Sequence, residues 1–315
     1  MTTPIAFVFP GQGSQKLGML STYAQVPEVR FTFTEASEVM GQDLWALAQT
    51  GPEEKLNDTR WTQPLLLTAC VALWRFWQSQ CDVKPAWMAG HSLGEYSALV
   101  CANALSLVDG VKLVHQRGTL MAEAVPQGQG AMAAILGLDK AAVVHLCAEI
   151  QDEVCEAVNF NSPEQTVVAG TQAGVHQLIE KAKAAGAKRA LLLPVSVPSH
   201  CALMKPAADL LTCYFEEHAG LLKKPEYPIL HNVDVATHAE PAALQAALIQ
   251  QLYSPVRWVE TIETLAQQGV TTFVECGPGK VLSGLNKRIC REAKAVSLEN
   301  LSDFESLLES LLTEI

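Results

Sequence analysis

A serine between two glycines is the first pattern in the chain that could do chemistry. Ser92 stands in Gly90-His91-Ser92-Leu93-Gly94, after an apolar segment at residues 86–89 and before a stretch from Glu95 to Ala102 that is typical of a helix. A strand, a tight turn bearing serine and a helix form the context that a G-x-S-x-G nucleophile elbow requires. The helix N-terminus would direct free N–H groups at the reacting atoms. Alone, the pattern fits an activated serine or a purely structural turn.

A serine nucleophile needs a general base within hydrogen-bond reach. Of the eight histidines, His91 adjoins Ser92, and we expect it to pack or to form a hydrogen bond at the helix entry rather than to act as the base. His200 lies in a turn-rich stretch from Val195 to Cys201, just after a change in sequence texture. Clefts form where a chain re-enters a domain, so His200 is the candidate base. Its local pattern alone fits an ordinary loop histidine equally well.

Two further segments could act on a substrate. The glycine-rich run Pro10-Gly11-Gln12-Gly13-Ser14-Gln15 lacks the third glycine of a dinucleotide fingerprint, because Lys16 stands there, and it lacks a Walker-type Gly-Lys-Ser/Thr. Its N–H groups could join that of Leu93 on an oxyanion, or the run could be a plain turn. Arg117, in a predicted helix, could bind a carboxylate with two parallel hydrogen bonds or pair with an internal acid.

The elements that must position these residues alternate between strands and helices, which predicts an α/β fold. Outside the middle of the chain, the predicted strands are residues 5–9, 86–89, 227–232 and 271–275. The predicted helices there are residues 62–78, 95–102, 105–125, 241–252 and 259–268, with a short helical stretch near 287–291.

The middle of the chain has a different order of elements. Its predicted strands are residues 131–136, 154–159, 165–169 and 188–193, and its predicted helices are residues 140–150 and 171–185. This β-α-β-β-α-β order is ferredoxin-like. We therefore expect a small domain at residues 126–198, inserted into a large domain made of residues 1–125 and 199–315.

Composition excludes several classes of function. The chain has 315 residues, of which 49% are hydrophobic and 17% charged, and its formal net charge of -11 argues against nucleic-acid binding. The apolar tract from Leu65 to Trp74 is too short to span a bilayer, and the N-terminus lacks the basic region of a signal peptide. Nine cysteines without metal-ligand spacing predict reduced core thiols, no metal and a cytoplasmic protein.

Taken together, these segments resemble the malonyl-CoA:acyl carrier protein transacylases of bacterial fatty-acid synthesis, and the resemblance runs along essentially the whole chain. Its markers are residues 7–15 (FVFPGQGSQ), 62–64 (TQP), 90–95 (GHSLGE), 116–118 (QRG), 159–163 (NFNSP), 198–200 (PSH) and 275–279 (ECGPG). The resemblance implies an α/β-hydrolase-like core with a parallel sheet and a ferredoxin-like insert. The methionine start and an end near Leu312 favour a free-standing enzyme over a synthase fragment.

The resemblance also implies a ping-pong acyl transfer without a cofactor. Ser92 would attack malonyl-CoA and hold the malonyl group as an ester, with His200 as base. The phosphopantetheine thiol of a holo acyl carrier protein would then take the malonyl group. The backbone N–H groups of Gln12 and Leu93 would stabilise the oxyanion, and the backbone carbonyl of Gln251 would orient the histidine, in place of an acidic residue.

The substrate contacts follow from the same resemblance. Arg117 would bind the malonyl carboxylate, with Gln12 and Asn161 also at the substrate. Leu93 and Ser199 would favour malonyl over methylmalonyl groups. We expect a monomer with no nucleic-acid or membrane partner.

The carrier protein must find a local basic patch, because carrier and chain are both acidic. Lys287, Arg288 and Arg291 are the predicted contact; a solvated basic face without a partner would have the same pattern. Lys188 and Arg189 form a second basic group.

The alternative function is a serine esterase or thioesterase of the α/β-hydrolase type. Such enzymes carry the catalytic histidine near the C-terminus, after an acid, whereas no histidine follows Val270 here. A Ser-Asp lipase with the acid in Asp109-Gly110 is a further alternative, although this dipeptide more simply separates two helices. A non-catalytic scaffold of this fold would have lost the nucleophile, the base or the arginine, and all three are present.

Overall fold

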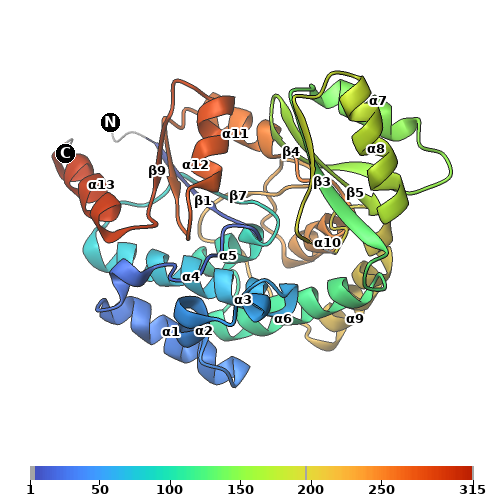
Figure 1. The fold of residues 1–315 in the computed structure, drawn as a ribbon. Helices are drawn as coiled ribbons and strands as arrows, with labels where there is room; N and C mark the ends of the chain where they lie inside the picture. The colour runs from blue at the N-terminus through green and yellow to red at the C-terminus, as the bar shows by residue number, and fades with distance from the viewer. Residues whose placement is uncertain (1–3, 196, 314–315) are drawn as a thin grey trace.

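Within the part of the chain that the structure describes, residues 4–195 and 197–313, the strands form one parallel and one antiparallel sheet (Figure 1). In this computed structural model the strands are β1 Ile5–Phe9, β2 Trp87–Gly90, β3 Gly130–Leu136, β4 Cys155–Ser162, β5 Gln165–Thr171, β6 Arg189–Leu192, β7 Ile229–Leu230, β8 Thr272–Glu275 and β9 Lys294–Ser297. The helices are α1 Pro27–Met40, α2 Leu44–Thr50, α3 Glu53–Leu56, α4 Thr59–Gln80, α5 Gly94–Cys101, α6 Leu107–Glu123, α7 Lys140–Ala148, α8 Gln172–Ala184, α9 Lys205–Glu217, α10 Pro241–Gln251, α11 Trp258–Gln267, α12 Val281–Ile289 and α13 Leu301–Thr313. Short 3-10 helices lie at Ser21–Tyr23 and Ala202–Met204.

The parallel sheet has the strand order β7-β2-β1-β8-β9 and is covered on both faces. All five residues of β1 are buried, as expected of a strand between two layers of helices. On one face Phe7 packs edge-on against Trp74 and Trp77 of α4, with ring centroids 5.1 Å apart in each pair. On the other face Ala6 and Val8 join the core of α11 and α12. The sheet is therefore rigid where its strands end, which is where the elbow lies.

The antiparallel sheet has the order β4-β5-β3-β6, and α7 and α8 cover one of its faces (Figure 1). This is the strand order that a β-α-β-β-α-β unit gives, and the predicted fold class is confirmed. The opposite face includes Met132 and Val158, which pack with Cys201 beside the candidate base. β4 is tied to the parallel-sheet part by a hydrogen bond from the Phe160 N–H to the Val256 carbonyl, 3.0 Å long. The predicted domain limits at 125/126 and 198/199 stay a prediction.

One predicted strand is much shorter in the structure, and several elements were not predicted. The strand predicted at residues 227–232 pairs with β2 only at Ile229 and Leu230. The chain then turns, because the His231 N–H bonds the Ala236 carbonyl and the next side chains reach the elbow. The elements that sequence reasoning left out are α1, α2, α3, α9, β9 and α13. No helix among the described residues is long and apolar enough to cross a membrane.

Candidate active site

The nucleophile elbow is built on backbone that leaves no room for side chains. Ser92 follows β2 with a positive φ of 53°, an uncommon conformation for a residue other than glycine and typical of a strained turn at a functional site. A Cβ on Gly90 would lie 1.9 Å from the carbonyl carbon of Gly94, and one on Gly94 would lie 2.0 Å from the Phe9 oxygen. Both glycines are therefore required, and they fix where Ser92 points.

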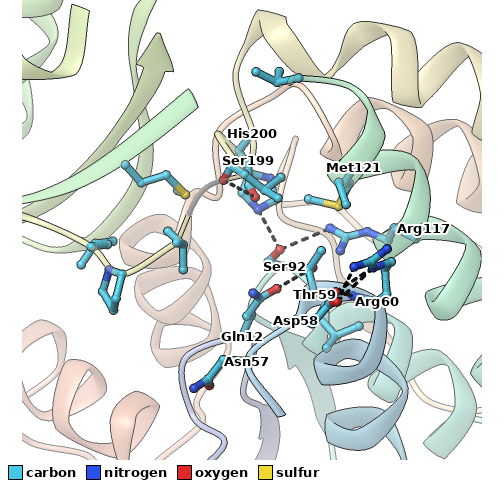
Figure 2. A pocket seen from close by; sticks show the side chains of 18 of the residues that line it. Gln12, Asn57, Asp58, Thr59, Arg60, Ser92, Arg117, Met121, Ser199 and His200 are labelled. Carbon is cyan, nitrogen blue, oxygen red and sulfur yellow. Dashed lines mark hydrogen bonds and ion pairs between the residues drawn. The ribbon is translucent and has the colours of Figure 1, made fainter. Parts of the chain in front are cut away.

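Ser92 and His200 form a hydrogen-bonded pair. The distance between Ser92 Oγ and His200 Nε2 is 2.7 Å (Figure 2). His200 Nδ1 lies 2.7 Å from the backbone oxygen of Gln251. A carbonyl can only accept, so Nδ1 carries the proton and Nε2 is free to take the serine proton. Gln251 is the last residue of α10, whose carbonyl end also favours the imidazolium that forms.

The environment of His200 keeps its imidazole neutral. His200 is 2% exposed, and burial, together with the charge of Arg117, lowers its pKa to about 3. The hydrogen bond to Gln251 opposes this shift without overcoming it. The residue is thus ready to accept a proton at neutral pH.

Arg117 is buried beside the nucleophile without a carboxylate partner. It is 1% exposed, and its Nη2 lies 3.3 Å from Ser92 Oγ. Its guanidinium donates to the side-chain oxygens of Gln63 at 2.8 Å and Gln251 at 2.9 Å, and no ion pair to it is found among the described residues. Burial lowers the pKa of Arg117, but from so high a value that it stays charged. The alternative that Arg117 pairs with an internal acid is wrong for the described residues.

The glycine-rich loop after β1 lies against the elbow. A Cβ on Gly11 would approach the His91 oxygen to 2.4 Å, so the loop backbone touches the turn that carries Ser92. Within the described chain, the N–H groups of Gln12 and Leu93 have no hydrogen-bond acceptor and remain available. The Gln12 side chain accepts a hydrogen bond of 2.9 Å from Thr59, which holds the loop in place.

These groups converge on one cavity of about 490 Å³ (Figure 2). Gln12, Ser92, Leu93, Arg117, Ser199 and His200 all line it. Met132, Asn159 and residues 193–195, from or next to the antiparallel sheet, form part of its wall. Among the described residues, no group of three histidine, cysteine or acidic side chains could hold a metal ion. Ser196, beside residues 193–195, lies outside the described residues.

The remaining predicted residues lie around this centre. Asn161 is buried but does not line the cavity; its Oδ1 lies 2.8 Å from Nε2 of His91, which does line it. His91 thus both forms a hydrogen bond and packs against Trp258, with ring centroids 5.4 Å apart. Lys287, Arg288 and Arg291 are exposed on and after α12, outside the cavity lining.

Sequence reasoning missed four polar residues behind the site. Gln63 holds Arg117, and Asn232 clamps the elbow, accepting from the Ser92 N–H at 2.7 Å and donating to the Gly90 oxygen at 2.6 Å. The other two are Glu95 and His231, a fully buried pair. Two signals could have found them: Glu95 is the one charged residue in the apolar helix α5, and residues 231–232 follow the carboxyl end of a parallel strand.

Comparisons with known proteins agree with this site. Residues 6–302 match the acyl transferase domain family. The chain is 54% identical to the malonyl CoA-acyl carrier protein transacylase of Escherichia coli, over 98% of this chain and 99% of that protein. It is 55% identical to the protein of the same name from Salmonella typhimurium, over 94% and 96% of the two chains.

Solved structures give the same result. The malonyl CoA-acyl carrier protein transacylase of Coxiella burnetii superposes with a TM-score of 0.96 at 48% identity, covering 99% of this chain and 98% of that one. A malonyl-transacylase solved in complex with a type II polyketide acyl carrier protein also gives a TM-score of 0.96, at 51% identity, covering 98% and 100%.

Proposed function

Because the chain belongs to the acyl transferase family and, within it, to the malonyl CoA-acyl carrier protein transacylases, we propose that it moves malonyl groups from malonyl-CoA to the phosphopantetheine thiol of an acyl carrier protein. The observation that carries this function is the buried Arg117, which has no acidic hydrogen-bond partner among the described residues and lies beside the Ser92–His200 pair. A buried cation next to a nucleophile suits an acyl group that carries its own carboxylate.

The reaction proceeds in two halves through an ester. Ser92 Oγ attacks the thioester carbonyl while His200 Nε2 takes the serine proton; the C–S bond then breaks, and the proton passes to the leaving CoA thiolate. In the second half, the carrier's phosphopantetheine thiol gives its proton to His200 and attacks the ester. The bond between the malonyl carbonyl carbon and Ser92 Oγ breaks, and Ser92 Oγ takes the proton from His200.

The roles of the other site residues are part of the proposal. The N–H groups of Gln12 and Leu93 stabilise the oxyanion in both halves, and their freedom from other acceptors supports this role. Arg117 binds the malonyl carboxylate. Ser199 and Leu93 limit branching next to the reacting carbonyl, and Asn161 acts on the substrate through His91, to which it is hydrogen-bonded.

No cofactor is needed for these steps, since the protein supplies nucleophile, base and oxyanion donors itself. We place the reaction in the cytoplasm, with the enzyme as a monomer; the nine free cysteines are consistent with a reducing compartment.

The esterase alternative has little support. Asp109, the acid that a Ser-Asp lipase would need, sits in the first turn of α6 and accepts a hydrogen bond from Ser106 at 2.7 Å. Ser92 is instead bonded to His200.

Mass spectrometry of the intact protein tests the function. After brief exposure to malonyl-CoA we expect one malonyl adduct, which is absent in Ser92→Ala and is discharged by holo carrier protein. An adduct lost to water as fast as to the carrier would indicate an esterase, and no adduct at all would reject the proposal.

The carrier contact is proposed at Lys287, Arg288 and Arg291. Their support is exposure and charge, and Arg288 is partly ordered by a 3.2 Å hydrogen bond to Gln165. The double variant Lys287→Glu/Arg288→Glu should raise the KM for carrier about ten-fold and leave CoA-dependent loading unchanged. Lys112→Glu, an exposed lysine on α6, is the matched control. Unchanged transfer to the carrier in the double variant would show that these residues do not contact the carrier.

A further inference from the structure

Glu95 is a carboxylate enclosed directly behind the nucleophile elbow. It lies in the first turn of α5, three residues after Ser92, and is fully buried. Three N–H groups point at it: the Gln251 side-chain amide at 2.6 Å, the Asn232 backbone at 3.2 Å, and Nδ1 of His231. A buried carboxylate that gathers donors from two distant segments is a structural hub, and the transfer chemistry described above gives it no role.

The partners of Gln251 fix which way its amide points. Its Nε2 donates to Glu95 and, at 3.0 Å, to the backbone oxygen of Ser92, while its Oε1 accepts from Arg117 at 2.9 Å. An ionised carboxylate can only accept and a guanidinium can only donate. Glu95 on one side and Arg117 on the other therefore allow a single orientation of the Gln251 side chain.

Gln251 connects this hub to all three groups of the reaction. Its side chain holds the carbonyl of Ser92 and the guanidinium of Arg117, and its backbone oxygen orients His200. Glu95 also bonds the backbone of Asn232, whose side chain clamps the Ser92 N–H. Among the described residues, the Glu95 carboxylate thus reaches the site through Gln251 and Asn232, while its backbone N–H bonds the Ser92 oxygen at 3.0 Å.

We propose that Glu95 is a positioning residue of the transfer reaction, which fixes the Gln251 amide and thereby holds Ser92, His200 and Arg117 in reacting geometry. The proposal rests on the proposed function for its substrate, but not for its geometry. It gives this Ser-His pair an acidic residue after all, placed one side chain further back than in a Ser-His-Asp triad.

His231 occupies Oε1 of the Glu95 carboxylate, while the Gln251 amide and the Asn232 N–H occupy Oε2. Burial disfavours the charged imidazole, yet the pKa of His231 is raised, because Glu95 and then Asp234 attract the proton. The other charged or titratable groups around the pair are Arg117 of α6, Tyr96 of α5, and His238, whose ring lies 5.1 Å from that of His231. His231 and Glu95 thus form a fully buried hydrogen-bonded pair.

Glu95→Gln tests the role, because it keeps size and replaces one acceptor by an N–H₂ donor. We expect kcat for malonyl transfer to fall about ten-fold or more with little change in the KM for malonyl-CoA, since the reacting groups are misplaced. The rate at which phenylmethanesulfonyl fluoride modifies Ser92 should fall similarly. This neutral reagent reports the Ser92–His200 pair without malonyl chemistry, so the test stands even if the proposed function fails.

Glu275→Gln is the matched control. Glu275 is also a fully buried glutamate, and it accepts the N–H groups of Leu282 at 3.0 Å and Ser283 at 2.7 Å, at the start of α12. It should lose stability without slowing the modification of Ser92. If both variants lower the rate of Ser92 modification in proportion to their loss of unfolding free energy, Glu95 is only structural and the proposal is overturned.

A double-mutant comparison tests the route through Gln251. Gln251→Ala keeps the backbone carbonyl and removes the side-chain amide. Adding Glu95→Gln to this variant should lower the rate of Ser92 modification by less than about two-fold further. Independent ten-fold losses that multiply would contradict the proposed route. If Glu95→Gln does not fold, Gln251→Ala alone decides: a ten-fold loss of sulfonyl fluoride reactivity supports the link, and a loss below two-fold refutes it.

Discussion

The parallel and antiparallel sheets contribute to one cavity in different ways. Among the described residues, the side chains within hydrogen-bond distance of Ser92 Oγ, those of His200 and Arg117, come from segments around the parallel sheet. The antiparallel sheet supplies Met132 and Asn159 as wall, and no group that bonds the nucleophile. Ser92 and the glycine-rich loop beside it thus lie on crowded backbone at the ends of parallel strands, whereas the cover is ordinary packing. Substitutions in the two regions should differ in kind as well as in size.

The largest contrast is between two glycines. Gly94→Ala puts a Cβ 2.0 Å from the Phe9 oxygen, so we expect a loss of about 3 kcal/mol or more in unfolding free energy and more than about 10²-fold in Ser92 acylation. Gly186→Ala, between α8 and β6, has open space and a φ of 91°, so it should cost about 1 kcal/mol and leave acylation unchanged. Urea unfolding and single-turnover loading measure both. Equal effects would erase the distinction between the regions.

Arg117→Ala sharpens the chemical side of the comparison. Losing a charged, bidentate partner should lower kcat/KM for malonyl-CoA about 10²-fold, and acetyl-CoA should lose much less, so that acetyl loading is relatively favoured. Arg75→Ala, a half-exposed arginine of α4 paired with Glu35, is the control and should change neither. An equal loss for malonyl and acetyl groups would show that Arg117 is structural.

Local sequence patterns predicted the fold class and the strand–turn–helix context of Ser92. The elbow glycines, the buried run of β1 and the β-α-β-β-α-β order each have short-range signals, and the structure contains all three. His200 is different, because its local pattern fits a catalytic base and an ordinary loop histidine equally well. The family resemblance is what favours the base. Its 2.7 Å contact with Ser92 joins positions 108 residues apart, which no local period encodes.

The contacts of Glu95 with His231 and Gln251, behind the elbow, could not be predicted for the same reason. Glu95, His231 and Gln251 lie on three separate segments, and only the folded chain brings their polar atoms together. The helices α1, α9 and α13 were missed, and the strand at residues 227–232 was predicted too long. In that strand the apolar pattern continued, but hydrogen bonds to the elbow ended the pairing after Leu230.

A substitution in the antiparallel-sheet wall of the cavity should mainly change how fast water hydrolyses the malonyl ester. Met132 is 6% exposed and packs beside Cys201, so Met132→Ala opens space next to the base. We expect the malonyl ester to hydrolyse about three-fold faster in the absence of carrier, with a smaller change in loading. Leu191→Ala, a 53% exposed residue of β6 outside the cavity lining, is the control. If Met132→Ala slows loading more than it speeds hydrolysis, the antiparallel sheet takes part in the chemistry.

The smallest expected effect is that of pH on loading. An ordinary histidine base with a pKa near 6.5 would lose about ten-fold in rate by pH 5.5. Burial first, and then Arg117, lower the pKa of His200 to about 3, so its neutral form persists and Ser92 loading should change by less than about two-fold between pH 8 and 5.5. Single-turnover loading at several pH values measures this, and a limb centred near pH 6.5 would contradict it.

The lowered pKa of His200 also sets how the unfolding free energy changes with pH, and it depends on the residues that bury His200. The unfolded chain takes up a proton at His200 near pH 6.5, whereas the folded chain does so only near pH 3. This contribution to stability is therefore complete above about pH 6.5 and is lost as the pH falls toward 3. Because burial is the largest cause, Met132→Ala should admit water, raise the pKa of His200 and bring the acid limb of loading to higher pH. An unshifted limb in that variant would mean that the parallel-sheet segments bury His200 without help from the antiparallel sheet.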